Sequence, residues 1–174
     1  MKTKTIMFAL ALSTISVAVQ AEVNCSKPVN QLQATTPSSD FIFHNDGTVT
    51  HKRTGLMWQQ CMVGETMSEF GECMGSADTL SWQDALQYAQ ASNFANHSDW
   101  RLASVKELSS ILEMSCEDPM INEAVFPTKY SSWVWSSTPV SSDNRALTLV
   151  FSHGFNQEVR RSYSRGVRLV RDTQ

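Results

Sequence analysis

The sequence predicts an α+β domain in which two helices pack on a twisted antiparallel sheet. Segments with helical spacing of apolar residues occupy the middle of the chain, and segments with strand-like alternation lie on both sides of them. Helices between two groups of strands are typical of an α+β fold in which N-terminal and C-terminal strands pair. Four cysteines, all between residues 25 and 116, predict that disulfides stabilise the domain.

The first 21 residues have the pattern of a secretory signal peptide. Lys2 and Lys4 precede an apolar run of about 14 residues, and Val19-Gln20-Ala21 suits a signal peptidase. The run is shorter than the roughly 20 residues of a membrane-spanning helix, so we expect no membrane span. The sequence therefore predicts export to the periplasm or to the cell exterior and surface.

After the signal peptide, residues 22–40 are expected to form an extended tail and residues 41–174 a single domain. Phe41–Phe43 and Thr48–Thr50 predict a β-hairpin, and Leu56–Trp58 a buried strand. Asn45 and Asp46 between the hairpin strands are interpreted as turn residues rather than calcium ligands.

Residues 61–80 are rich in glycine, serine and acidic residues and are expected to form a surface loop. A first helix should begin after Ser81 and run to about Phe94. Ser104 and Glu107 have the spacing of a capping box, which predicts a second helix from Ser104 to near Ser115. Four strands should follow, over residues 133–137, 146–151, 155–159 and 166–170.

Cys25, Cys61, Cys73 and Cys116 allow three disulfide pairings. We favour Cys61–Cys73, which closes a short polar loop, and Cys25–Cys116, which ties the tail to the end of the second helix. A zinc site is disfavoured because no two cysteines have the short spacing of zinc ligands. No metal and no cofactor is expected.

Charge is distributed unevenly along the chain. Without the two lysines of the signal peptide, the 14 basic residues fall to 12, against 17 acidic ones, which argues against nucleic acid as a partner. Residues 61–123 contain 11 acidic side chains and two basic ones, whereas residues 145–171 contain six arginines and Glu158. Such asymmetry indicates either an anion-binding surface near the C-terminus or two segments of opposite charge that face each other.

Nine short motifs occur in an order known from one protein family. They are Asp46-Gly47-Thr48-Val49, Thr54-Gly55-Leu56-Met57-Trp58, Ser81-Trp82-Gln83-Asp84-Ala85-Leu86, Ser98-Asp99-Trp100-Arg101-Leu102, Lys106-Glu107-Leu108, Ile121-Asn122, Phe126-Pro127, Trp135-Ser136-Ser137 and Val167-Arg168-Leu169-Val170-Arg171. In this order they resemble the Lcl-type C-terminal domain family, named for the C-terminal end of a bacterial collagen-like adhesin. The resemblance covers residues 40–172.

The turn before the second helix and the closing motif are also similar to formylglycine-generating enzymes and to the C-type-lectin-like fold. This likeness implies two helices on a twisted antiparallel sheet with neighbouring termini. The reactive C-terminal cysteines of those enzymes are missing after Cys116, as are the calcium-binding triplets of the lectins. The adhesin domain is associated with sulfated glycans, which implies an acidic glycan as a partner.

The candidate ligand-binding residues combine arginine forks with aromatic rings, which suit sulfate or carboxylate groups and sugar faces. They are Arg160, Arg161, Tyr163, Arg165, Trp133 and Trp135. A solvated hairpin for the arginines and burial for the tryptophans are the alternatives. We expect a non-catalytic binding module for acidic glycans, sulfated or uronic, or for another cell-surface polymer.

A structural or protein-interaction domain of a bacterial envelope assembly is the second hypothesis, and an uncharacterised enzyme is the third. The potential bases of an enzyme are His44, His51, His97 and His153. Ser152 precedes His153, but neighbours on a strand point to opposite faces, so we expect no proton transfer between them and no catalytic residues.

Overall fold

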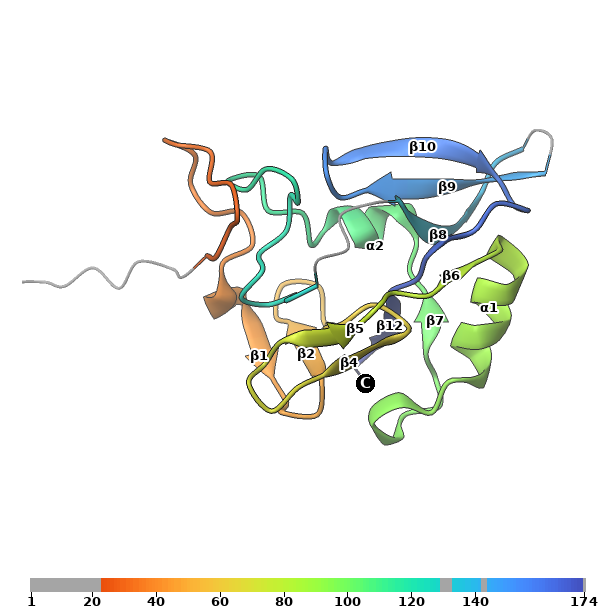
Figure 1. Cartoon of the computed structure of the whole chain (residues 1–174), viewed down its shortest axis with the longest axis horizontal. Helices are drawn as coiled ribbons and strands as arrows, with labels where there is room; N and C mark the ends of the chain where they lie inside the picture. The colour runs from red at the N-terminus through yellow and green to blue at the C-terminus, as the bar shows by residue number, and fades with distance from the viewer. Residues whose placement is uncertain (1–22, 129–132, 142–143, 174) are drawn as a thin grey trace, which may run out of the picture.

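The structure is a computed structural model that describes residues 23–128, 133–141 and 144–173 (Figure 1). The predicted signal peptide lies outside these residues. The described chain has an α+β fold with two five-stranded sheets and a separate two-stranded hairpin. No helix in the described ranges is long and apolar enough to cross a membrane.

The first sheet contains the predicted N-terminal hairpin and pairs it with the end of the chain. Its strands, in spatial order, are β1 (Phe41–Phe43), β2 (Thr48–His51), β3 (Leu56–Gln59), β12 (Leu169–Asp172) and β7 (Arg101–Leu102). Strand β12 runs antiparallel to β3, with Val170 opposite Trp58. The expected pairing of N-terminal and C-terminal strands is therefore confirmed.

The second sheet is formed mainly by the last third of the chain. Its strands, in spatial order, are β10 (Phe155–Arg160), β9 (Arg145–Val150), β8 (Trp133–Pro139), β11 (Arg165–Gly166) and β6 (Thr79–Leu80). Three of its four neighbouring pairs are antiparallel, namely β10–β9, β9–β8 and β11–β6, and β11 meets β8 in parallel, with Gly166 opposite Val134. In Figure 1 strands β8, β9 and β10 lie at the top, above the first sheet.

The prediction of one closing strand over residues 166–170 was wrong. Strand β11 belongs to the second sheet and β12 to the first, and Val167 and Arg168 connect them. The carbonyl of Val167 accepts a hydrogen bond from the backbone N–H of Val63 at 3.0 Å. The segment thus leaves one sheet and enters the other, a change that an apolar alternation does not reveal.

Both helix starts are as predicted, but both helices are shorter. Helix α1 (Trp82–Ala91) begins after Ser81, whose hydroxyl accepts from the backbone N–H of Asp84, and it ends before a 3-10 turn, η2 (Phe94–Asn96). Helix α2 (Val105–Ser109) has the complete capping box of Ser104 and Glu107. It ends well before Ser115.

The early end of α2 has a local cause. The hydroxyls of Ser109 and Ser110 donate to the carbonyls of Val105 and Glu107, at 2.8 and 2.7 Å, and such bonds compete with helix continuation. The next backbone N–H, that of Ile111, reaches only the carbonyl three residues before it. The chain then turns away from the helix axis.

Residues 61–80 are more regular than the predicted surface loop. They contain β4 (Glu65–Met67) and β5 (Cys73–Gly75), which pair as a hairpin, followed by β6. The disulfide Cys61–Cys73 is present, as is Cys25–Cys116. The favoured disulfide pairing is therefore confirmed.

The N-terminal tail is fixed to the domain by more than its disulfide. It includes a 3-10 turn, η1 (Ser38–Asp40), and an isolated bridge between Pro28 and Cys116. The buried carboxylate of Glu113 accepts hydrogen bonds from the backbone N–H groups of Thr35 and Thr36. The tail thereby covers one end of the core.

Two apolar clusters fill the interior. The larger one lies between the two sheets, with Trp58, Phe126 and Leu149 fully buried, and includes Leu108 of α2. The second joins α1, through Ala85 and Ala89, to both sheets. Together they hold the C-terminal strands at fixed positions relative to the start of α1.

Candidate binding surface

The six C-terminal arginines do not form one surface. Arg168 is fully buried, and Arg171 forms an ion pair with Asp99, the two atoms being 2.6 Å apart. This ion pair lowers the pKa of the Asp99 carboxyl. Segments of opposite charge therefore do meet in the fold at this point. Among the predicted ligands, Arg160, Arg161 and Arg165 are left near the surface.

Arg168 is a structural residue of the core. Its Nη1 donates to the carbonyl oxygens of Gln59 and Gln60, and its guanidinium lies 4.8 Å from the centre of the Phe126 ring. Burial lowers the pKa of Arg168 to about 10, against the opposing effect of Glu65. The side chain anchors the crossing between the two sheets and is closed to solvent.

Arg161 is held against the first turn of α1. Its guanidinium lies 4.2 Å from the centre of the Trp82 ring, which is the geometry of a cation–π contact. Its Nε donates to the carbonyl of Arg145, and its own carbonyl accepts from the backbone N–H of Trp82. The guanidinium is thus oriented while its two terminal nitrogens have no hydrogen bond within the described chain.

Arg165 lies between two aromatic rings. Its guanidinium is 4.4 Å from the centre of the Trp133 ring and 5.5 Å from that of Tyr163. The Nη1 atom donates to the carbonyl of Ser164, and Tyr163 is 52% exposed. Arginine and aromatic side chains therefore lie next to one another on this surface.

A shallow cavity of about 320 Å³ lies beside Arg161. Its lining residues are Ser81, Trp82, Gln83, Asn144, Arg161 and Ser162. We refer to this cavity together with Arg160, Trp133, Tyr163 and Arg165 as the arginine–aromatic surface. It lies where the end of β10 meets the start of α1, at the right of Figure 1.

Trp135 does not belong to this surface. It shares a strand face with Trp133, as predicted, but it is fully buried, and its Nε1 donates to the carbonyl of Leu80 at 2.8 Å. Its ring is closed to a ligand, so its assignment as a binding residue was wrong. Trp133, the first residue of β8, is half-buried.

Two members of the surface were missed in the sequence. Trp82 was not among the predicted ligands, but it is half-buried and the Arg161 guanidinium lies over its ring. Its position directly after the N-cap is a signal, because the first helical turn is often partly exposed. Asn144 has no such signal, since only the β9–β10 pairing brings it to Arg161, whose backbone N–H donates to its carbonyl at 2.9 Å.

The expectation that Ser152 and His153 point apart was wrong. They lie in the turn between β9 and β10 rather than on a strand, and the Ser152 hydroxyl and His153 Nδ1 are hydrogen-bonded at 2.7 Å. A serine nucleophile also needs a group that orients its base. Within the described ranges, the His153 ring makes one hydrogen bond, and its partner is Ser152.

The other three histidines have separate surroundings. His44 is hydrogen-bonded to Thr50, and His97 packs edge-on against Trp100. His51 is buried and stacks on Phe41 with the ring centres 4.7 Å apart. Burial lowers the pKa of His51, and the charge of Arg53 adds to this effect.

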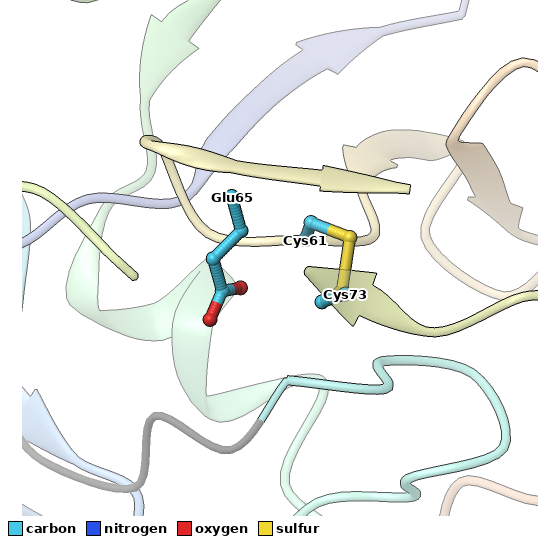
Figure 2. A group of neighbouring side chains, drawn as sticks. All are labelled: Cys61, Glu65 and Cys73. Atoms are coloured by element: carbon cyan, nitrogen blue, oxygen red, sulfur yellow. A yellow bond between two sulfur atoms is a disulfide. The ribbon is translucent and has the colours of Figure 1, made fainter. Parts of the chain in front are cut away.

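Cys61, Glu65 and Cys73 place two sulfurs and a carboxylate within 4.8 Å of one another (Figure 2). The two sulfurs are joined as a disulfide and are not thiolates, which are the form that binds metals. The Glu65 carboxylate accepts from the backbone N–H of Met62 and from the hydroxyl of Thr128. These contacts make the group a structural link between the hairpin and the domain.

The fold and the surface define a disulfide-stabilised α+β domain with an ordered array of arginine and aromatic side chains. The sequence matches the model of the Lcl C-terminal domain family over residues 47–171, which is more than half of the chain. The protein belongs to the Lcl C-terminal domain family. No curated protein matches the sequence.

Proposed function

We propose that the protein is an exported, non-catalytic module that binds acidic glycans, sulfated or uronic, through the arginine–aromatic surface. The observation that carries the proposal is the alternation of guanidinium groups and aromatic rings in Trp82–Arg161 and Trp133–Arg165–Tyr163. Guanidinium forks match the planar geometry of carboxylate and the oxygens of sulfate, and rings match the faces of sugars.

The contacts of the arginines favour binding of an external anion. Arg160 is exposed and Arg161 and Arg165 are half-buried. The described hydrogen bonds of Arg161 and Arg165 go to backbone carbonyls rather than to carboxylates. Their positive charges therefore have no acidic partner among the described ion pairs.

The finer fold assignment and the location belong to the same proposal. A C-type-lectin-like arrangement of two helices and a twisted sheet is consistent with the strand order, in which the end of the chain pairs with its first hairpin. The two disulfides and the signal-like N-terminal sequence support export to the periplasm or the cell surface.

Binding of the oxidised mature protein to immobilised sulfated, uronic and neutral glycans tests the proposal. We expect binding to the acidic glycans that weakens steeply as salt is added, because exposed charges are screened. The variant Arg160→Ala/Arg161→Ala/Arg165→Ala should bind at least tenfold more weakly, since one charge-assisted hydrogen bond contributes about 1.5–3 kcal/mol.

A second triple variant, Lys52→Ala/Arg53→Ala/Lys106→Ala, removes the same number of positive charges, from exposed side chains in other parts of the molecule. It should retain binding if the site is local. Equal losses in the two variants would show general charge attraction, and no binding to any acidic glycan would refute the proposal.

A further inference from the structure

The hairpin β4–β5 carries large apolar side chains on its outer surface. At its tip, Phe70 is 84% exposed, and Met74 on β5 is 53% exposed. Phe43, at the end of the edge strand β1, is 43% exposed beside the same hairpin. In Figure 1 the hairpin lies at the lower left, over β1 and β2 and far from the end of β10.

Two hollows flank the tip of the hairpin and share Gly71 and Ala124 in their linings. One, of about 410 Å³, lies between β5 and the segment after α2 and includes Met74. The other, of about 320 Å³, lies toward β1 and includes Phe43 and Met67. The two form a continuous surface on both sides of Gly71, and we call this surface, together with Phe70 at the tip, the hairpin face.

The hairpin face is acidic. Glu72 and Glu123 line the first hollow, and Glu69 lines the second. Among the described side chains that line the two hollows, none is lysine or arginine. Glu69 and Glu72 are exposed, on either side of Phe70. Apolar anchors between carboxylates complement a chain in which lysine or arginine stands next to large apolar residues.

The hairpin face is also rigid before any partner binds. The disulfide Cys61–Cys73 fixes the base of the hairpin, and the backbone N–H of Cys73 donates to the carbonyl of Pro127. At the tip, the N–H of Ser68 donates to the carbonyl of Glu72 at 2.8 Å. A preformed surface loses little conformational entropy on binding, which favours affinity.

We infer that the hairpin face binds an extended, cationic segment of another protein, with apolar side chains in the two hollows and lysine or arginine against Glu69 and Glu72. The inference does not depend on glycan binding, because the hairpin face and the arginine–aromatic surface have no residue in common. One molecule can therefore hold a basic protein segment and an acidic glycan at the same time.

Calorimetry with synthetic peptides tests this inference. The probe is an extended peptide in which lysine and leucine alternate, compared with one peptide that has glutamine for lysine and another that has serine for leucine. We expect the full protein to bind the probe at least tenfold more tightly than either control peptide, since both the charges and the apolar anchors contribute.

Two variants of equal charge locate the site. Glu69→Gln/Phe70→Ser/Glu72→Gln changes the hairpin face, and Glu117→Gln/Phe155→Ser/Glu158→Gln changes an exposed phenylalanine and two exposed carboxylates elsewhere. The first should weaken binding of the probe about tenfold or more, and the second should leave it unchanged. Neither variant alters an arginine of the glycan surface, so glycan binding is measured as an independent control.

Two results would overturn the inference. Equal weakening in both variants would mean general attraction of a cationic peptide to an acidic protein. Self-association of the wild-type protein that the hairpin variant abolishes would mean that a second copy, rather than a foreign segment, occupies the face.

Discussion

Replacement of Glu113 by glutamine is the most direct test of how the N-terminal tail is held. The Glu113 carboxylate is fully buried. It accepts hydrogen bonds from the backbone N–H groups of Thr35, Thr36 and Ser115, at 3.0, 2.6 and 2.9 Å, and from the hydroxyl of Ser115 at 2.6 Å. All of these groups point donors at the carboxylate, and a glutamine amide would bring a further donor among them.

The expected cost follows from these contacts. If the amide oxygen keeps the bonds to the tail, its NH₂ group faces Ser115, whose hydroxyl can rotate while its backbone N–H cannot. One buried donor left without an acceptor costs about 1–3 kcal/mol, and loss of charge weakens the remaining bonds. We expect Glu113→Gln to lower the free energy of unfolding by about 3 kcal/mol.

The pH dependence gives a second measure of the same interaction. Burial alone would raise the pKa of Glu113, but the hydrogen bonds from Ser115 and from the backbone of Thr35, Ser115 and Thr36 outweigh it and lower the pKa. The pKa in the folded state is therefore below the value of about 4.3 in the unfolded chain. The stabilisation is complete above that value and is lost as pH falls through the folded-state pKa.

Urea unfolding followed by tryptophan fluorescence measures both effects. Glu117→Gln serves as the control, because Glu117 is exposed. It should change stability by less than about 0.5 kcal/mol. A Glu113→Gln protein as stable as wild type, or one with the same loss of stability below about pH 4, would refute this account of the tail.

Three further outcomes follow from buried or constrained positions. Burial lowers the pKa of His51, so wild-type stability should fall as pH is lowered through about 6.5, the ordinary value in the unfolded chain, and His51→Gln should show less of this fall in urea titrations at each pH. Gly64→Ala should lower the melting temperature in calorimetry, because the φ angle of Gly64 is +91° and an added Cβ would lie 2.5 Å from the backbone nitrogen of Asp78. An unchanged melting temperature would contradict that geometry. Arg101 donates to the Glu107 carboxylate through two nitrogens, at 2.7 and 2.9 Å, so Arg101→Lys should lower the free energy of unfolding in urea by about 1 kcal/mol. An unchanged free energy of unfolding would show that the two-nitrogen contact is dispensable.

Local signals in the sequence were sufficient for the starts of both helices, for the first hairpin, for strands β3, β8, β9 and β10, and for the favoured disulfide pairing. Ser81 and Ser104 fix helix starts because their hydroxyls accept from backbone N–H groups only three residues away. The family could also be identified in this way, since short motifs occur in a fixed order over residues 40–172, and the family model matches residues 47–171. The lengths of both helices were overestimated, because the serines that end α2 act by hydrogen bonds that apolar spacing does not show.

The tertiary structure decided which arginines face solvent and which aromatic rings they meet. Arg168 and Arg165 are close in sequence, yet the chain passes from one sheet to the other between them, so one is buried and the other stacks on Trp133. The contact of Arg161 with Trp82 joins residues far apart in sequence. Composition and motifs were enough to predict a compartment for the protein and to indicate that arginine and aromatic side chains are its candidate ligand-binding groups. Their arrangement as a surface depends on contacts between residues far apart in sequence, such as Trp82 with Arg161 and Trp133 with Arg165, which no local pattern indicates.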